Sequence, residues 1–223
     1  MDLFDNLLPE ETLTPLVPGA VLLHGFAREG DALLLQAIES VLTQAPLRHW
    51  QTPGGYTMSV GMSNCGPLGW VSGASGYRYT AQDPASNQPW PAMPERLMDL
   101  ARRAAAQGGY PHFEPDACLI NQYAPGAKLS LHQDKDEQDL SAPIVSLSLG
   151  LPAVFLFGTP SRTDRPQRWR LVHGDVVVWG GPSRLAFHGV NALADGEHAL
   201  LGQRRLNLTF RRVVGQAGLN VPL

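Results

Sequence analysis

The feature that most constrains the fold is a series of short apolar runs in the second half of the chain. From Asp116 onward, runs of β-branched and apolar residues alternate with turns built from Gly, Pro and Asp, and helical periodicity is absent. Short strands at this spacing are typical of an antiparallel sandwich or barrel. The sequence therefore predicts a jelly roll over about residues 116–212. Its eight strands are expected at 117–123, 128–132, 144–149, 153–157, 169–172, 176–179, 185–188 and 206–212.

Two helices are predicted before this series. Asp31 is a suitable N-cap for a helix over about residues 31–42, whose apolar residues recur at helical spacing. A second helix is expected to begin near Pro94, and the pair Gly108-Gly109 would end it. Helices followed by strands indicate an α+β protein, here a jelly roll with N-terminal helices.

The length and composition fit one domain. The chain has 223 residues, of which 43% are hydrophobic, so it can bury a substantial core, and a single domain over residues 1–223 is expected. With 17 basic and 20 acidic residues, the formal net charge is -3, which argues against a protein coated in positive charge. A local basic groove would still be able to hold a polyanion, so the net charge does not decide the partner.

The cellular setting is inferred from the cysteines and the N-terminus. Cys65 and Cys118 are isolated in the sequence and form no C-x-x-C pair, which suits core-filling thiols in a reducing compartment. Residues 1–18 have neither the basic start nor the apolar run of a signal peptide, and no apolar stretch reaches the length of a membrane span. We therefore expect a cytoplasmic protein without a membrane partner.

A His-x-Asp motif supplies candidate metal ligands. In an extended strand, His132 and Asp134 point to the same side and can share one metal ion, and His188 can supply a third ligand once a sandwich folds back on itself. Two histidines and one carboxylate leave open positions on a non-haem Fe(II), which is a site for oxygen chemistry. A second copy, at His173 and Asp175, precedes a buried strand, and we interpret Asp175 as a turn residue.

The segment 50–90 is rich in aromatic residues and glycine but poor in aliphatic residues. An alternating run at 57–62 suits a hairpin. Such a segment cannot form much of a core by itself, but its rings can cover a flat ligand, and stacking of a base on an aromatic ring contributes about 1–3 kcal/mol. The alternative is that these rings, Trp50 and Trp90 among them, only anchor loops to the sandwich.

The last predicted strand carries two arginines on one face. Alternation places Arg205 and Arg211 together, opposite the apolar residues of the strand. If the polar face that carries these arginines points to solvent, the strand is an ordinary sheet edge. If it faces the inside of the jelly roll, the buried guanidinium groups require an anion, and a dicarboxylate would satisfy both. Asn121 and Tyr123, two residues apart on another strand, would add hydrogen bonds. The spacing alone leaves both readings open.

Taken together, these motifs resemble the AlkB family of Fe(II)- and 2-oxoglutarate-dependent dioxygenases. The resemblance covers about residues 52–212 and is closer to the bacterial members than to the animal relatives. The matched blocks occur in order along the chain: 52–60, Gly69-Trp70, 115–121, Asn121-x-Tyr123, His132-Gln133-Asp134-Lys135-Asp136, His188 and Arg205-x-Asn207-x-Thr209-x-Arg211. So many ordered blocks make the resemblance highly specific. The family implies a double-stranded β-helix, which is the fold reached from the strand pattern.

The resemblance implies a role for each matched residue. The implied iron ligands, and hence catalytic residues, are His132, Asp134 and His188. The implied 2-oxoglutarate contacts are Asn121, Tyr123, Arg205, Asn207 and Arg211. A nucleotide-recognition lid over about residues 50–90 and the adjoining substrate pocket are implied to use Trp70, Tyr77, Arg78, Tyr79, Asp136 and Arg162. Trp70 and His132 are expected to enclose the target base, and Asp136 to meet its exocyclic amine.

Two of these residues have plainer readings without the resemblance. Asp136 would then be one of four acids in a solvated loop at 134–139. Arg162 belongs to an arginine-rich stretch at 162–170, which fits a solvated basic loop as well as it fits contacts to phosphates.

The family implies oxidative demethylation of N-alkylated bases, such as 1-methyladenine and 3-methylcytosine, in DNA. Decarboxylation of 2-oxoglutarate with Fe(II) and O2 is coupled to hydroxylation of the methyl group and release of formaldehyde. A monomer acting preferentially on single strands is expected, because an unpaired base is turned out of its stack at lower cost, and RNA is a further candidate substrate. Two alternatives remain open: a related oxygenase acting on tRNA or protein, and a non-catalytic jelly roll that binds a metal and a small acid.

Overall fold

Two antiparallel sheets pack face to face in the computed structural model, which describes residues 13–215. Their facing side chains form a shared apolar core that includes Leu119, Phe157 and Trp179. The larger sheet contains, in spatial order, β1 (Leu13–Val17), β2 (Ala20–Leu23), β11 (Val176–Trp179), β8 (Ile144–Gly150), β13 (Arg205–Arg211), β6 (Ala117–Tyr123) and β3 (Gly61–Cys65). The smaller sheet contains β10 (Gln167–Leu171), β9 (Ala153–Phe157), β12 (His188–Val190) and β7 (Leu129–His132). The outermost parts of the predicted domain, 1–12 and 216–223, lie outside the described residues.

The eight strands from β6 to β13 divide four and four between the two sheets, which confirms the predicted α+β jelly roll. One strand differs clearly from its predicted position. The strand expected at 185–188 begins only at His188, because the turn η1 (Gly181–Ser183) and a bond from the Ala186 amide to the Ser183 carbonyl curl the preceding chain. The larger sheet also recruits β1, β2 and β3, which precede the predicted jelly roll in the sequence.

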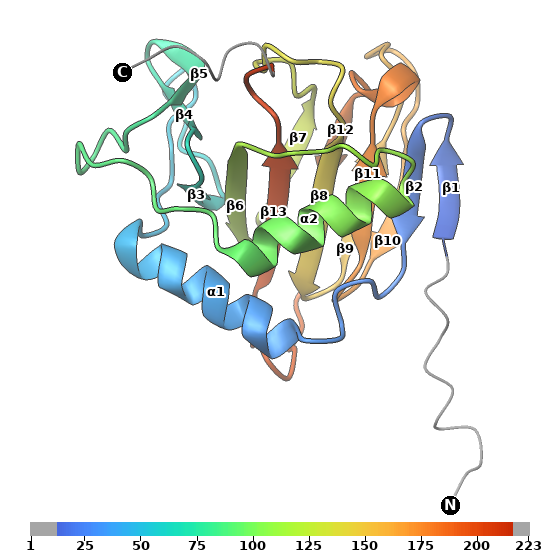
Figure 1. Cartoon of the computed structure of the whole chain (residues 1–223), viewed down its shortest axis with the longest axis horizontal. Helices are drawn as coiled ribbons and strands as arrows, with labels where there is room; N and C mark the ends of the chain where they lie inside the picture. The colour runs from blue at the N-terminus through green and yellow to red at the C-terminus, as the bar shows by residue number, and fades with distance from the viewer. Residues whose placement is uncertain (1–12, 216–223) are drawn as a thin grey trace, which may run out of the picture.

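The helices α1 (Asp31–Gln44) and α2 (Glu95–Gln107) cover the outer face of the larger sheet (Figure 1). Ile38 of α1 and Leu97 of α2 are fully buried, and both join a second apolar cluster with side chains of that sheet. One face of the larger sheet is therefore closed by helices. The other face remains available for a ligand between the two sheets.

The start of α1 differs from the sequence-based prediction. The N-cap position belongs to Gly30, which adopts a φ of 81°, and Asp31 is already the first residue of the helix. The Asp31 carboxylate lies 3.1 Å from Nε2 of His173 and makes no capping bond. The predicted Asp31 cap is therefore wrong, because Gly30 occupies the cap position and the Asp31 carboxylate accepts a hydrogen bond from His173 outside the helix.

A separate hairpin, β4 (Gly69–Gly73) and β5 (Gly76–Thr80), stands beside the sandwich (Figure 1). The alternating run at 57–62 forms one arm of a hairpin, as predicted, because it pairs antiparallel with 48–51 through the bridges Gln51–Thr57 and Arg48–Met62. The end of the run also enters β3, where Met62 pairs with Asn121 of β6. Trp90 anchors the β4–β5 hairpin, and its indole donates a hydrogen bond to the Thr80 carbonyl at 3.0 Å. A Cβ on Gly69 would lie 2.4 Å from the Trp90 ring, so the close approach of the two segments requires glycine.

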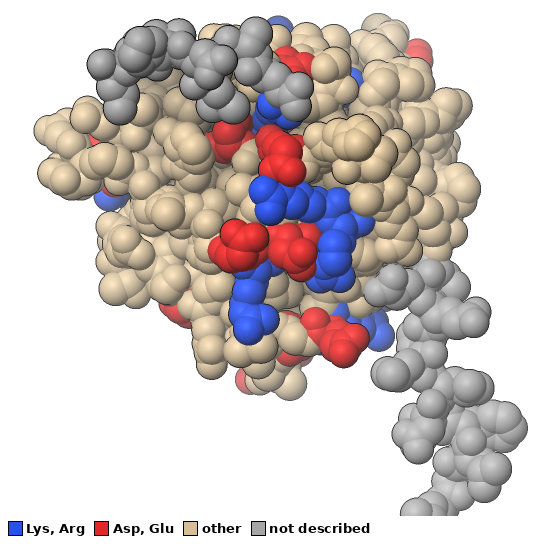
Figure 2. All heavy atoms as spheres, viewed as in Figure 1, with Lys and Arg blue, Asp and Glu red and all other residues tan. Residues whose placement is uncertain are grey.

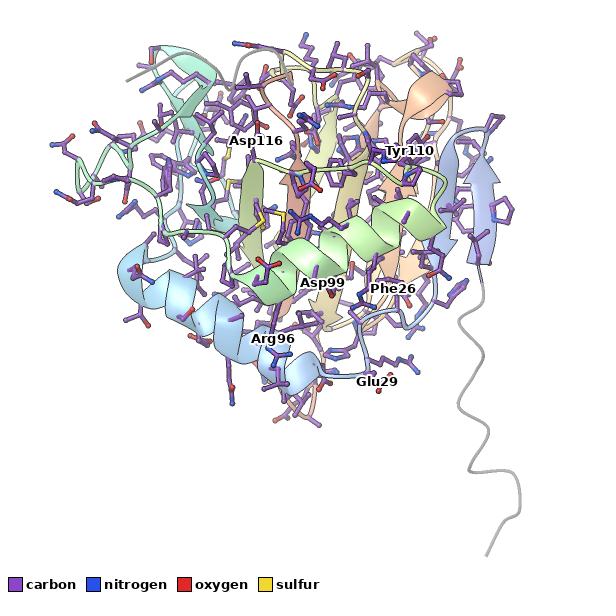
Figure 3. All side chains as sticks on the ribbon, viewed as in Figure 1. Phe26, Glu29, Arg96, Asp99, Tyr110 and Asp116 are labelled. Carbon is purple, nitrogen blue, oxygen red and sulfur yellow. The ribbon has the colours of Figure 1, made fainter. Side chains whose placement is uncertain are left out.

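The connection from α2 to β6 is fixed at both ends (Figure 3). The Tyr110 hydroxyl donates to the Gly19 carbonyl at 2.9 Å, between β1 and β2. The Asp116 carboxylate accepts hydrogen bonds from the amides of Val213 and Val214 at 2.6 and 2.9 Å, just beyond β13. These bonds anchor the connection to the turn between β1 and β2 at one end and to the chain just beyond β13 at the other.

The two cysteines face each other inside the fold. Cys65 of β3 and Cys118 of β6 are register partners, and both are free thiols with no exposed surface. Burial, with the neighbouring Cys65 thiol as a further cause, raises the pKa of Cys118 well above its usual value. Both residues therefore serve the core as expected. In residues 13–215, no helix has the length and apolar character needed to cross a membrane.

Candidate iron and cosubstrate site

A cavity of about 530 Å³ opens between the two sheets. Its inner wall includes Arg205 and Asn207 of β13, and His188 of β12 faces them from the smaller sheet. Trp70 and Tyr77 contribute aromatic rings from the β4–β5 hairpin. The polar faces of strands that lie far apart in the sequence therefore converge on one volume, and the β4–β5 hairpin borders it.

His132, Asp134 and His188 converge in this cavity. Their ligand atoms all lie within 4.8 Å of one another, and in residues 13–215 no other set of three or more His, Cys, Asp or Glu side chains converges as closely. Nε2 of His132 lies 3.7 Å from Oδ1 of Asp134, and Nε2 of His188 lies 3.7 Å from Oδ2. His188 is the register partner of His132 across β12 and β7, which explains why both rings meet Asp134. Two imidazoles and one carboxylate in this arrangement suit Fe(II) with positions left open.

Hydrogen bonds orient both imidazoles. Nδ1 of His132 lies 2.8 Å from the Ser130 carbonyl, and Nδ1 of His188 lies 3.0 Å from the Ala186 carbonyl. A carbonyl accepts from Nδ1–H, so each Nε2 keeps a free lone pair directed toward Asp134. Burial first, and the nearby His132 second, lower the pKa of His188 to about 4. The His188 ring is therefore neutral at physiological pH, as a metal ligand must be.

The Asp134 carboxylate is ionised. Burial alone would raise its pKa, but Arg211 above all, followed by His188 and His132, holds the pKa well below its usual value. Nε and one terminal nitrogen of Arg211 donate to Oδ2 of Asp134 at 3.0 and 2.7 Å. The carboxylate therefore carries the negative charge that a cation requires, and Arg211 fixes its orientation.

Unsatisfied donors mark a place for an anion beside the candidate metal ligands. Among residues 13–215, Nε and one terminal nitrogen of Arg205 and the hydroxyl of Tyr123 are buried without a hydrogen-bond partner. Oδ1 of Asn121 also lacks a partner, but as an acceptor it suits a donor and not an anion. The Arg205 guanidinium lies over the Tyr123 ring, 5.0 Å from its centroid, and donates to Oγ of Ser148 at 2.8 Å. Because buried donors without partners are costly, a carboxylate of 2-oxoglutarate fits this corner of the cavity.

Arg211 and Asn207 differ from Arg205, because each already makes several polar contacts within the chain. Arg211 pairs with Asp134, and its Nε lies 3.3 Å from Oε1 of Glu137. Asn207 donates to Ser146 and to the carbonyl of Leu147. Both residues line the cavity and remain predicted cosubstrate contacts, whereas Arg205 has buried donors that lack a partner.

Four of the predicted substrate residues line the cavity: Trp70, Tyr77, Asp136 and Arg162. The rings of Trp70 and Tyr77 stack at 5.3 Å between centroids, with 19° between their planes. Nε1 of Trp70 donates to Oδ2 of Asp136 at 3.1 Å, so the hairpin touches the loop that carries Asp134. The Arg162 guanidinium lies over the Phe187 ring at 5.5 Å.

Arg78 and Tyr79 lie away from the cavity lining. Arg78 is exposed and donates to Ser75 at 2.7 Å. The Tyr79 hydroxyl donates to Oε1 of Glu137 at 2.6 Å, and burial raises the pKa of this phenol well above its usual value. Their assignment as substrate contacts stays a prediction. In this structure, Tyr79 connects the lid to a buried carboxylate.

Sequence reasoning missed two buried charged residues at the site. Glu137 is 6% exposed and Arg184 is 3% exposed, and a terminal nitrogen of Arg184 lies 3.1 Å from Oε2 of Glu137. Glu137 was missed because it belongs to an acid-rich loop, whose sequence predicts exposure to solvent. The available signal was Arg184 itself, which stands in the otherwise apolar run that leads to His188.

The second His-x-Asp copy has a different structural role. Asp175 is 2% exposed and accepts hydrogen bonds from the amides of Gly25 and Val172 at 2.9 and 2.8 Å. Nδ1 of His173 accepts the Gly150 amide at 3.0 Å. Asp175 therefore closes a turn, which matches its interpretation from the sequence.

Replacement of Asp175 by alanine is expected to lower the free energy of unfolding by about 2–3 kcal/mol, because two buried amides lose their acceptor. Iron affinity should stay unchanged. Urea unfolding of the apoprotein and anaerobic Fe(II) titration check both parts. A folded Asp175→Ala protein that fails to bind Fe(II) would contradict the structural role.

Comparison with known proteins identifies the family. The sequence pattern of the 2OG-Fe(II) oxygenase superfamily matches residues 19–211. The alpha-ketoglutarate-dependent dioxygenase AlkB of Escherichia coli (strain K12) is 57% identical over 212 residues, covering 95% of this chain and 97% of that protein. The tRNA demethylase abh1 of Schizosaccharomyces pombe is 35% identical over 159 residues, covering 66% of this chain and 53% of that protein. The solved structure of OsALKBH1 superposes with a TM-score of 0.77 at 30% identity, covering 90% of this chain and 100% of that one.

These similarities confirm the predicted enzyme class, with Fe(II), 2-oxoglutarate and O2 as its cofactor and cosubstrates. The alternative of a non-catalytic binding module is therefore set aside. The converging histidines and carboxylate fit the iron, and the unsatisfied donors around Arg205 fit the dicarboxylate. The chain belongs to the AlkB family of Fe(II)- and 2-oxoglutarate-dependent dioxygenases.

Proposed function

We propose that this enzyme removes alkyl groups oxidatively from N-alkylated bases of nucleic acid, with single-stranded DNA preferred. The observation that carries the proposal is the stacked pair of Trp70 and Tyr77 at the cavity, with the Asp136 carboxylate bonded to the Trp70 indole. A flat, positively charged ring suits an aromatic surface next to a carboxylate. Methylation at the Watson–Crick edge, as in 1-methyladenine and 3-methylcytosine, produces such a ring.

We assign iron binding to His132, Asp134 and His188. Iron, when bound, supplies O2 activation coupled to decarboxylation of 2-oxoglutarate, which oxidises the alkyl carbon so that a methyl group leaves as formaldehyde. The chain contributes the orientation: backbone carbonyls hold both Nδ1 atoms, and Arg211 keeps the carboxylate ionised. We assign one carboxylate of 2-oxoglutarate to Arg205, helped by Tyr123, because these residues carry the buried donors that the chain leaves unsatisfied.

We assign discrimination against undamaged bases to Asp136. The carboxylate is exposed to the cavity mouth and favours a cationic ring over a neutral one of the same shape. A base held between Trp70 and His132 would lie beside Asp136, since Trp70 already contacts this carboxylate at 3.1 Å. Undamaged adenine and cytosine are neutral and also stay paired in a duplex, so they are disfavoured twice.

The charge distribution supports binding of the polymer at the cavity mouth. The helical face shows acidic and basic side chains side by side (Figure 2). Several are paired there, including Arg102 with Glu114 at 2.6 Å and Arg103 with Asp99 at 2.9 Å. Such a mixed surface does not attract a polyanion. Lys128, Lys135 and Arg162, in contrast, line the cavity, where they suit phosphates on either side of a bound base.

We treat the chain as a single catalytic domain, with about residues 50–90 forming the lid and about 116–212 the jelly-roll core. The contact from Trp70 to Asp136 supports a lid that works as part of this domain. The proposal includes a monomer in the cytoplasm, as the sequence predicts. Sedimentation equilibrium and cell fractionation test these two statements.

The experiment that tests the proposed function follows formaldehyde release from defined oligomers that contain one methylated base. Single-stranded DNA with 1-methyladenine or 3-methylcytosine is expected to give formaldehyde and succinate in equal amounts. The same sequence as duplex DNA and as RNA should react more slowly. Formaldehyde from RNA or from a methylated peptide, without any from DNA, would overturn the choice of DNA and support the tRNA or protein alternative.

Replacement of Asp136 by alanine is expected to raise KM for 3-methylcytosine at least 10-fold, because the cationic base loses its counter-charge. Decarboxylation of 2-oxoglutarate in the absence of nucleic acid should be retained, since Asp136 touches neither Arg205 nor the proposed iron ligands. Steady-state kinetics at several concentrations of oligomer check the prediction. Asp139→Asn is the matched control on the same loop, and an equal loss in that variant would contradict a specific role for Asp136.

A further inference from the structure

Arg184 makes the most concentrated set of buried contacts near the proposed iron ligands. The side chain is 3% exposed, and its three nitrogen atoms reach three different acceptors. One terminal nitrogen donates to the Asp134 carbonyl at 2.7 Å, the other to Oε2 of Glu137 at 3.1 Å, and Nε to the Ala142 carbonyl at 2.9 Å. All three acceptors belong to the same loop, which joins β7 to β8.

This loop has no regular hydrogen-bond ladder of its own. β7 ends at His132 and β8 begins at Ile144, so Asp134 follows the last paired residue by two positions and receives no support from a neighbouring strand. The far part of the loop is held elsewhere, because the amides of Gln138 and Asp139 donate to the Val213 carbonyl. The backbone around Asp134 therefore depends on side-chain donors.

Arg184 brings these donors from the segment that leads to His188. Arg184 is the residue after η1, and the irregular segment 185–187 separates it from His188. The next residue, Leu185, accepts a hydrogen bond from Nε2 of Gln133 at 2.6 Å, so the same two segments are joined a second time. Contacts of Arg184 thus connect the chain on both sides of the proposed iron site.

We propose that Arg184 is a positioning residue for iron binding, which fixes the main chain of Asp134 relative to His188. This proposal rests on the ligand set assigned above. Arg211 holds the Asp134 carboxylate, while Arg184 holds its backbone, and both constraints are needed to keep one oxygen facing each imidazole. A planar guanidinium is required, because three acceptors in different directions match its fork and exceed what one ammonium group reaches.

The expected effect is a loss of metal affinity rather than a change in substrate recognition. Outer hydrogen bonds that orient metal ligands typically change metal affinity or activity by about 10- to 100-fold. We expect the Fe(II) dissociation constant to rise about 10-fold in Arg184→Lys and up to about 100-fold in Arg184→Met. KM for the methylated oligomer should change little, because Arg184 lies outside the cavity lining.

Arg212→Met is the matched control. Arg212 is also buried, at 8% exposure, and it approaches the same loop through Asp139 at 3.6 Å. Its other contact is the Val214 carbonyl, so it contacts neither Asp134 nor the segment before His188. If the substitutions only weaken the loop in general, Fe(II) affinity should fall in both the Arg184 and the Arg212 variants. If Arg184 positions Asp134, Fe(II) affinity should fall in the Arg184 variants alone.

The test measures Fe(II) affinity by anaerobic calorimetry for the wild type, His132→Ala, Arg184→Lys, Arg184→Met and Arg212→Met, each checked for native circular dichroism. The visible spectrum of bound Co(II) gives a second readout of ligand geometry. The lysine variant decides the result if the methionine variant does not fold. If folded Arg184→Lys has the Fe(II) affinity and the Co(II) spectrum of the wild type, the role of Arg184 is overturned. The role is also overturned if Arg212→Met loses as much Fe(II) affinity as the Arg184 variants. Equal Fe(II) affinity of wild type and His132→Ala would instead overturn the ligand set, and this proposal with it.

Discussion

Replacement of Asp134 by alanine is expected to abolish iron binding and also to destabilise the apoprotein by about 3 kcal/mol. The first effect follows from loss of the carboxylate between His132 and His188. The second follows from Arg211, which is 6% exposed and would lose its closest counter-charge, at 2.7 Å. Glu137 at 3.3 Å would remain, which places the cost at the lower end of the range for a broken buried ion pair.

The comparison with His132→Ala separates the two effects. The His132 side chain is 35% exposed, and without it Asp134 still pairs with Arg211 at 2.7 Å, so this variant should lose iron and turnover while its unfolding free energy changes little. Urea unfolding with chelator present measures the stability of both apoproteins, and anaerobic titration measures iron. An Asp134→Ala protein as stable as the wild type would show that Arg211 does not depend on Asp134.

Replacement of Arg205 by methionine is expected to weaken 2-oxoglutarate binding at least 100-fold while leaving the apoprotein folded and no less stable. In the apoprotein, burial lowers the pKa of Arg205, and two of its nitrogen atoms have no partner among residues 13–215. An apolar side chain of similar length removes this cost. In the complex, the same change leaves a buried carboxylate without a cation, which costs about 2–5 kcal/mol in binding.

Thermal unfolding with and without 2-oxoglutarate measures both parts of this prediction. A ligand that binds only the folded protein raises the melting temperature with the logarithm of its concentration once this exceeds the dissociation constant, and Arg205→Met should lose this increase. Arg204→Met is the control one residue earlier, because Arg204 is 38% exposed and pairs with Glu39 at 3.5 Å. Retention of the 2-oxoglutarate shift in Arg205→Met would contradict the assignment of the cosubstrate to Arg205.

The strand pattern predicted the jelly roll because burial on a sheet imposes alternation that survives in the sequence. β6, β9 and β11 lie where the apolar runs place them. The hairpin predicted from the run 57–62 is present, because this run pairs with the nearby segment 48–51. The sequence did not show that the end of the run also joins the main sheet, because its partner there, Asn121, is distant in sequence.

The site was predicted in part. Spacing brought His132 and Asp134 together, but the choice between a solvent-facing and a buried Arg205 needed the sheet arrangement, which buries it to 1% exposure. Glu137 was missed because it looks like a surface charge in its acid-rich loop, and Arg184 was missed because its place in an apolar run does not reveal which residue it pairs with. Their burial depends on mutual pairing across the fold, and local sequence patterns carry no information about such pairs.

Because His188 pairs with His132 in the sheet, the positions of the two imidazoles do not depend on the lengths of the connecting loops. β12 has three residues, and the ladder continues past an irregularity at Gly189, where an added Cβ would lie 2.7 Å from the Leu129 carbonyl. A slip of one residue would turn the ligand to the opposite face. The β9–β10 connection, which carries Arg162, lies outside this register. Insertions there are expected to alter which polymers are accepted while the reactive centre stays intact, so loop exchange is a practical route to new specificities on this scaffold.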